Sequence, residues 1–183
     1  MTQRTPLPEF GPSEDLLLRI LRDYFYGDPH TFDPPPGAEF VPHIRTLLPE
    51  DTKFPLLLVR RDRRSGSQTL DTNDQRHSLS AVATLETLCQ GDDADEANAL
   101  LQEAVRLCIL GAVEKQAGYP DLGYLNRVNI WSQPARVSDY ATSTGVVQYA
   151  SLPNGVVRYE SIYQFIMRPV EAGKTGNPYI RHN

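Results

Sequence analysis

The stretch that decides the fold reads Phe-Pro-Leu-Leu-Leu-Val-Arg-Arg from Phe54 to Arg61. Four consecutive apolar residues predict a central strand that is covered on both faces. A second strand is predicted from Ser78 to Cys89, where apolar and polar residues alternate, with Ser80, Thr84 and Glu86 expected on the polar side. A polar, charged insert of residues 62–77 separates the two strands, and we interpret it as a long hairpin arm.

Two amphipathic helices are predicted around this pair of strands. The first begins at Ser13, carries an apolar stripe and ends near Gly27. The second runs from about Asp93 to Gln116, and the pattern Asp93-x-x-Glu96 predicts a capping box at its start. Gly118 and Pro120 are expected to stop it.

The remaining strands complete an α+β domain. Residues 40–48 are expected to include a short strand or turn, and further strands are predicted from Tyr124 to Trp131 and from Gly155 to Pro169. We predict an α+β fold with a mixed or antiparallel sheet of about four strands packed against two helices. We expect residues 13–170 to form this single domain, with 1–12 as an N-terminal arm and 171–183 as a C-terminal tail.

Composition and charge narrow the classes of function. The chain has 183 residues, 40% of them hydrophobic and 22% charged, which is ordinary for a globular domain. Its formal net charge of −5 argues against a general nucleic-acid binder, because such a protein needs a basic face. No apolar run has the length of a membrane span, and the first residues lack the apolar centre of a signal peptide.

No residue pattern predicts a catalytic, cofactor or metal site. The four histidines, His30, His43, His77 and His182, lie in predicted loops or the tail without a second ligand at metal-binding spacing. Cys89 and Cys108 are expected to be buried and free, with a disulfide as the alternative. The segment from Asp71 to Asp74 lacks the glycine and the trailing glutamate of a calcium loop, and no Gly-x-Ser-x-Gly or phosphate-binding loop is present.

The basic run Arg60-Arg61-Asp62-Arg63-Arg64 is the strongest local charge feature. It is interpreted as the end of a strand that enters a polar hairpin, with contact to phosphate as the alternative. Four arginines in an acidic protein also suit an acidic surface on a neighbouring subunit. Trp131 is expected in the core or on a sheet face, whereas Tyr140 and Tyr149, in a long loop, are interface candidates.

The order and pattern of these segments resemble the tail-terminator (tail-completion) proteins of long-tailed, siphovirus-type phages that infect actinobacteria. The resemblance covers roughly residues 14–170 and rests on 54–61, the strand to Cys89, the helix from Ala94 to Val113, and the segments 124–137 and 149–169. It implies a virion subunit that forms a hexameric ring on the head-proximal end of the tail tube. The ring would stop tube growth and join the filled head, and DNA would only pass through its channel.

The resemblance implies a homo-oligomer whose partners are the tail-tube protein and a head-completion or stopper protein, without catalytic residues or cofactors. Interface residues are predicted from position alone, in the arm from Arg61 to Arg76 and in the loop from Arg136 to Tyr149. They are Arg60, Arg61, Arg63, Arg64, Arg76, Arg136, Tyr140 and Tyr149. Alternatives are another neck component, a tail-tube subunit, a small metal-dependent enzyme that uses Asp71 or Asp74, and a regulatory module that binds through the arginine-rich arm.

Overall fold

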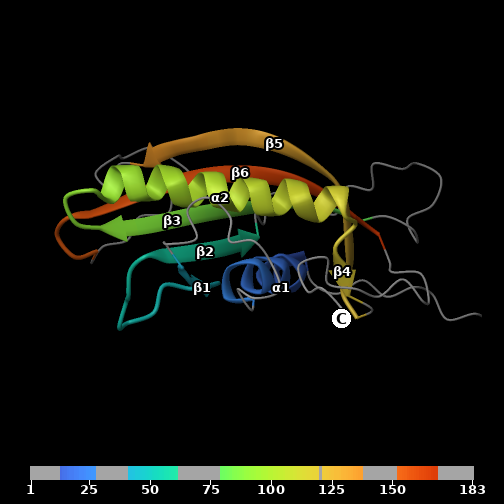
Figure 1. Ribbon diagram of the computed structural model, residues 1–183, viewed down its shortest axis with the longest axis horizontal. Coiled ribbons are helices and arrows are strands. Elements are labelled where there is room, and N and C mark those ends of the chain that lie inside the picture. The colour runs from blue at the N-terminus through green and yellow to red at the C-terminus, as the bar shows by residue number, and fades with distance from the viewer. Residues whose placement is uncertain (1–12, 28–40, 62–78, 120, 138–151, 169–183) are drawn as a thin grey trace, which may run out of the picture.

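The computed structural model describes residues 13–27, 41–61, 79–119, 121–137 and 152–168. These residues form two helices and six strands (Figure 1). In chain order the elements are α1 (Ser13–Tyr26), β1 (His43–Arg45), β2 (Leu56–Arg61), β3 (Leu79–Gln90), α2 (Ala94–Glu114), β4 (Gly118–Tyr119), β5 (Gly123–Val137) and β6 (Val156–Arg168). The α+β class, the mixed sheet and the two helices are therefore confirmed.

The six strands form one sheet in the order β1-β2-β3-β6-β5-β4. The pair β1–β2 is parallel and the other pairs are antiparallel. Long strands occupy the centre, and the two edges carry β1, of three residues, and β4, of two. The sheet thus has two strands more than the four expected: β4, and β1, which lies where the sequence predicted a short strand or turn.

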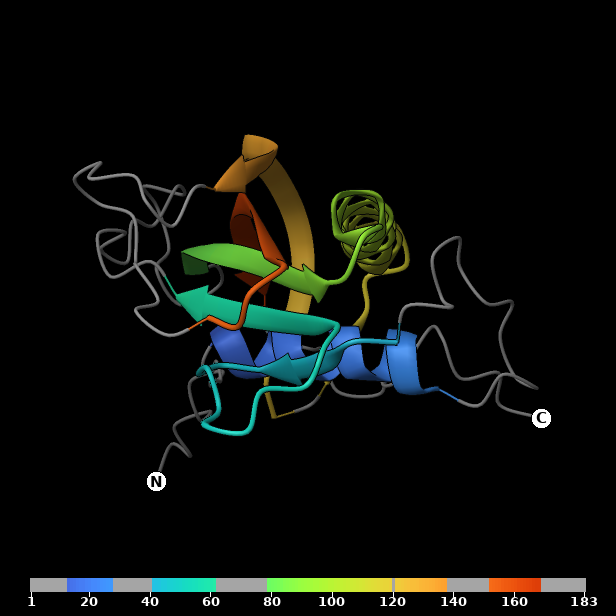
Figure 2. The ribbon, with the colours of Figure 1, turned by 90° about the vertical axis from the view of Figure 1, so that its left-hand side faces the viewer.

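Both helices pack on the same face of the sheet (Figure 2). One continuous hydrophobic core lies between the helices and the sheet. It contains leucine and isoleucine side chains of α1, the inward side chains of α2, and the alternate side chains of the strands that face the helices. Fully buried members include Leu16, Leu101, Leu125 and Phe165. Because each helix contributes one apolar stripe and the strands contribute residues at period two, the core follows from the patterning of the sequence.

A smaller apolar cluster lies on the opposite face of the sheet. Its buried members are Leu56, Leu58 and Leu88, and the partly buried Leu48 and Phe54 pack against it. Leu48 and Phe54 belong to the turn between β1 and β2, so this turn folds over the face that the helices leave uncovered. The prediction that both faces of residues 56–59 are covered is confirmed by their burial.

Two local expectations were wrong. The carboxylate of Asp93 makes no capping hydrogen bond, and its φ of −96° and ψ of 19° differ from the extended backbone of an ordinary N-cap residue. Strand β5 continues six residues beyond Trp131, through Pro134, because β6 pairs with it as far as Val137. Proline is tolerated there because, among the described residues, β4 covers only the first part of the outer edge of β5.

A bulge in β5 also changes which side chains face the helices. The register shifts between Leu125 and Arg127, so that Leu125 and Val128 both pack in the main core. Regular alternation along the strand would instead place Leu125 on the side opposite Val128. Trp131 lies on the uncovered face, where 59% of its surface is exposed, and its indole N–H donates to Gln164 Oε1 at 3.2 Å.

The edge of the sheet at β1 is closed by a side chain of α1. The hydroxyl of Tyr26 donates to the Pro42 carbonyl at 2.5 Å and accepts from the Ile44 N–H at 3.0 Å. Arg22 donates to the Ile44 carbonyl at 3.5 Å. These bonds occupy backbone groups that an open edge strand would offer to another chain.

Candidate interaction surfaces

A buried ion cluster lies on the uncovered face of the sheet. Arg60 on β2 pairs with Glu86 on β3, and Arg158 Nη1 on β6 lies 3.7 Å from Glu86 Oε2. The side chains of Glu86 and Arg158 are fully buried, and that of Arg60 is 22% exposed. Two guanidinium groups flanking one carboxylate offset much of the cost of burying these charges. The cluster joins three neighbouring strands.

The predicted polar side of β3 is therefore not a wet surface. Glu86 lies on that side of the sheet, as alternation along the strand predicts, and Arg158 of β6 lies beside it. Their burial is the correction: the ion cluster and the neighbouring apolar cluster exclude water from this part of the face.

A second, exposed polar cluster lies on the helix side. Arg136 Nη1 on β5 lies 3.0 Å from Asp95 Oδ2 in the first turn of α2, and the Tyr159 hydroxyl donates to Asp95 Oδ1 at 3.2 Å. Local burial and the hydrogen bond to the Asp95 carboxylate raise the pKa of Tyr159. The contacts hold the start of α2 against β5 and β6, and with both charged groups more than half exposed the ion pair contributes little to stability.

The structure describes only part of the predicted interface set. Arg60 and Arg136 lie on opposite faces of the sheet and each has a carboxylate partner within the subunit. Arg61 is the last residue of β2, and its side chain is not among those that the structure describes. Arg63, Arg64, Arg76, Tyr140 and Tyr149 lie outside the described residues, and so do the arm, the two chain ends, and Asp71 and Asp74.

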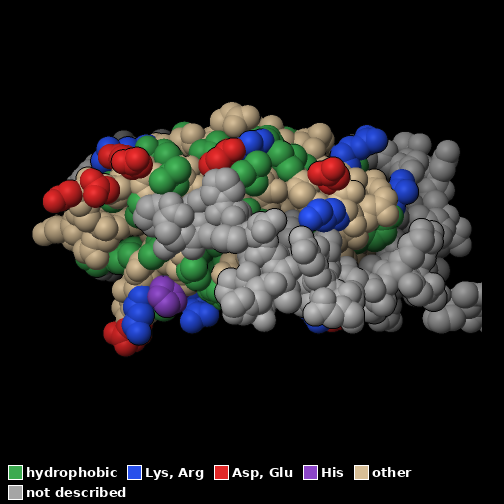
Figure 3. Space-filling model, viewed as in Figure 1, with side chains coloured by type: hydrophobic (Ala, Val, Ile, Leu, Met, Phe, Trp, Pro, Cys, Tyr) green, Lys and Arg blue, Asp and Glu red, His purple; other side chains and the backbone are tan. Residues whose placement is uncertain are grey.

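Helix α2 carries a surface that the sequence reading missed. We define the α2 face as its outward residues: Glu96, Leu100, Glu103, Leu107, Leu110 and Glu114. Helical spacing places these on one side of α2. Leu100 and Leu110 are each 37% exposed, and Figure 3 shows hydrophobic side chains interspersed with charged ones over the position of α2. The sequence contains the pattern that predicts this surface, because leucines also recur at helical spacing on the side of α2 opposite its core residues.

On the same helix, Arg106 donates two hydrogen bonds to the Glu103 carboxylate, at 2.6 and 2.7 Å. These bonds hold the pKa of Glu103 below its ordinary value. Arg106 thus keeps Glu103 ionised at neutral pH.

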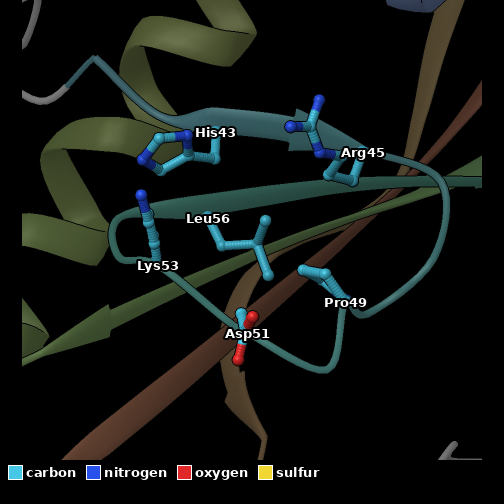
Figure 4. Close-up of a pocket in the computed structure, with 6 residues that line it drawn as sticks. All are labelled: His43, Arg45, Pro49, Asp51, Lys53 and Leu56. Atoms are coloured by element: carbon cyan, nitrogen blue, oxygen red, sulfur yellow. The ribbon is translucent and has the colours of Figure 1, made fainter.

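A basic hollow of about 190 Å³ lies where β1 meets the turn that follows it. We define the β1 corner as the residues that line it, His43, Arg45, Pro49, Asp51, Lys53 and Leu56, together with the neighbouring Val41 and Leu47. Figure 4 shows His43 and Lys53 pointing toward one another across the hollow. Leu56 is buried and forms an apolar floor, while the charged residues are exposed. Val41 and Leu47 are 48% and 78% exposed.

A cluster of polar contacts, called the hub below, joins α1 to β4 and the turn that follows it. Arg19 Nη1 lies 3.1 Å from Asp121 Oδ1, its guanidinium stacks 4.1 Å from the centre of the Tyr119 ring, and the Tyr119 hydroxyl donates to Asp23. Burial, together with the bond to Asp23, raises the pKa of Tyr119 well above its usual range. Tyr119 is therefore a poor acid, and the hub is structural.

Within residues that the structure describes, no three histidine, cysteine or acidic side chains converge in a way that could hold a metal ion. Cys89 and Cys108 are both buried and neither forms a disulfide bond, and burial raises the pKa of Cys89 to about 11. Neither described helix is long and apolar enough to cross a membrane.

Comparison with known proteins adds no family to these observations. No protein-family model matches the chain, and no curated protein matches its sequence.

Proposed function

We propose that this chain is a structural virion protein, the tail terminator of a siphovirus-type phage. In this proposal, copies of the chain form a ring, with six subunits expected, at the head–tail junction. One side of the ring caps the last ring of tail-tube protein, and the other receives a head-completion or stopper protein. The mechanism is geometric, because the ring presents a face that cannot accept another tube subunit.

The observation that carries this proposal is the α2 face. A helix that packs on a sheet normally keeps its outward side polar, whereas α2 exposes Leu100 and Leu110 there. Apolar side chains bordered by charged ones are typical of a surface that another protein covers. Together with the resemblance in sequence, this surface favours a subunit built for assembly.

The charge of the chain agrees with a passive DNA channel. A formal net charge of −5 gives little attraction for phosphate, so DNA would pass through a ring of such subunits without being held. The cations Arg60 and Arg136 are each paired with a carboxylate of the same subunit, which further reduces the positive charge available to DNA.

The test is the molar mass of the purified protein, alone and mixed with tail-tube protein, by light scattering with negative-stain imaging. We expect closed rings or capped tube ends. The double variant Leu100→Glu/Leu110→Glu should remain folded and lose both, because burying new charges at a subunit contact is costly. Trp131→Glu, which adds a charge at another exposed apolar side chain, is the control.

The same experiment separates the alternatives. Unlimited growth of tubes from this chain alone would identify a tail-tube subunit, and binding only to head-side neck proteins would identify a head-completion or stopper protein. A strict monomer that ignores tube ends and neck proteins would contradict the proposal as a whole. Turnover of a substrate that is lost on changing Asp71 or Asp74 would instead favour the metal-dependent enzyme.

A further inference from the structure

We propose that, in the assembled ring, the α2 face of one copy docks on the β1 corner of the next copy. This inference rests on the proposed function, because it names the subunit contact of that ring. Three properties of the two surfaces support it: their apolar side chains, their charges and their positions on the fold.

Both surfaces carry apolar side chains that are exposed in the part of the chain that the structure describes. At the β1 corner these are Val41 and Leu47, beside a hollow with Leu56 as its floor. On the α2 face they are Leu100 and Leu110. Covering both sets at one contact removes apolar surface of two copies from water at the same time.

The charges of the two surfaces are opposite. Three basic residues, His43, Arg45 and Lys53, line the hollow with one carboxylate, Asp51. The α2 face carries three exposed glutamates, Glu96, Glu103 and Glu114, of which Glu103 is paired with Arg106. A glutamate offers a carboxylate on a short apolar stem. The stem suits the Leu56 floor, and the carboxylate suits the basic rim.

The two surfaces lie on different sides of the sheet. His43 and Arg45 are in register with Leu56 and Leu58, which belong to the cluster on the face that the helices leave uncovered. The outward side of α2 points away from the helix-covered face. A subunit with complementary surfaces on opposite sides makes a head-to-tail contact, which repeats around a ring until the rotation closes it.

The closed edge of β1 makes this a contact between side chains. Tyr26 already occupies the Pro42 carbonyl and the Ile44 N–H, so a neighbour cannot extend the sheet at these groups. Among the described residues, the hollow and its basic rim remain available to a second copy at this end of the sheet.

Charge reversal tests the contact. Variant one is Arg45→Glu/Lys53→Glu, and variant two is Glu96→Lys/Glu114→Lys. In variant two the effects on the helix dipole oppose one another, because one lysine is added near each end of α2. The control, Arg127→Glu/Arg168→Glu, changes the net charge as variant one does, at exposed arginines of β5 and β6. Molar mass is measured with and without tail-tube protein, and circular dichroism confirms folding.

Each variant alone should weaken assembly by about tenfold or more in the concentration required, because like charges meet at the contact. The control should assemble as the unmodified chain does. The chain that carries all four changes, with both signs reversed, should again form rings of the original mass. Rescue in this chain is the decisive result, because two surfaces that do not touch cannot compensate for one another.

Several outcomes would overturn the inference. The first is assembly that is unaffected by variant one. The second is a chain with all four substitutions that remains folded but does not recover assembly. The third is recovery of that chain as a closed dimer, which would indicate a reciprocal contact. Variant-one rings that fail only to cap tubes would assign the β1 corner to the tube protein instead. In each of these outcomes the unmodified chain still forms rings, so the proposed function is retained. An unmodified chain that neither forms rings nor caps tubes would contradict both the proposed function and the proposed subunit contact.

Discussion

The side chain of Arg60, near the end of β2, forms an ion pair with Glu86 of β3, whose carboxylate is fully buried. Arg158 of β6 lies on the other side of the same carboxylate. Arg60 belongs to the basic run that was predicted to contact a neighbouring subunit. In this structure it pairs within its own subunit instead, where it compensates the buried negative charge of Glu86.

Replacing Glu86 by glutamine should therefore destabilise the protein strongly. The change leaves two guanidinium groups beside a neutral amide, and loss of one member of a buried ion cluster typically costs about 3 to 5 kcal/mol. Urea unfolding at pH 7 measures the free energy. The control is Glu160→Gln, at the β6 residue in register with Glu86 and partly exposed, which should cost less than about 1 kcal/mol. Equal effects of the two changes would contradict the role of Glu86.

Removing the hydroxyl of Tyr26 should open the edge of the sheet at β1. Tyr26→Phe leaves the Ile44 N–H and the Pro42 carbonyl without this partner, at a cost of about 1 to 2 kcal/mol. Hydrogen exchange should show faster exchange at the Ile44 amide and little change in β3. The control, Tyr159→Phe, removes a hydroxyl bonded to the exposed Asp95 and should leave Ile44 unaffected. An unchanged Ile44 amide in Tyr26→Phe would show that the hydroxyl does not close the edge.

Stability should fall at alkaline pH. The unfolded chain releases the Cys89 proton near the ordinary pKa of 9.0, whereas burial holds it in the folded protein until a pKa of about 11. Between these values the unfolded state binds fewer protons, so the free energy of unfolding decreases as pH rises, and the contribution of Cys89 to this loss levels off above pH 11. Burial also raises the pKa of Tyr24 and of Tyr119, which extends the loss in the same direction.

The variant Cys89→Ala isolates the part that this thiol contributes. It should be less stable than the unmodified protein at pH 7, because a buried side chain becomes smaller. Its additional loss of stability between pH 8 and pH 11 should, however, be smaller by about 2 kcal/mol. Urea unfolding across this pH range measures the difference. A slope identical to that of the unmodified protein would exclude Cys89 as a source of the pH dependence.

Gly118 should resist replacement for reasons of space. A Cβ added there would lie 2.3 Å from the Cβ of Tyr124 and 2.6 Å from the Gly123 carbonyl oxygen. Gly118→Ala must therefore push β4 away from β5, at about 1 to 3 kcal/mol. Gly155→Ala is the comparison: its φ is +78° and no atom lies within 4 Å of the added Cβ, so only backbone strain of about 1 kcal/mol is expected. Chemical unfolding of both variants measures the difference, and an equal or smaller loss in Gly118→Ala would contradict the close approach.

The candidate surfaces were only partly predictable from the sequence. Arg60 was expected near the end of a strand and Arg136 in a loop, whereas Arg136 lies on β5. Their carboxylate partners lie 26 and 41 positions away along the chain. No local pattern specifies such pairs. The outward leucines of α2 were present as a helical pattern and were overlooked beside the stronger core stripe. The β1 corner depends on how the turn of residues 46–55 folds over Leu56, which no periodicity encodes.

The sequence by itself determined the long elements. The helices at 13–26 and 94–114 and the strands at 56–61, 79–90 and 156–168 follow from hydrophobic periods that repeat over enough residues to be distinctive. Tertiary structure alone decided the extension of β5 past Pro134, its bulge beside Leu125 and the burial of Glu86. The physical reason is common to all three. Each depends on hydrogen bonds or ion pairs with a strand distant in the sequence, and these exist only after the sheet has formed.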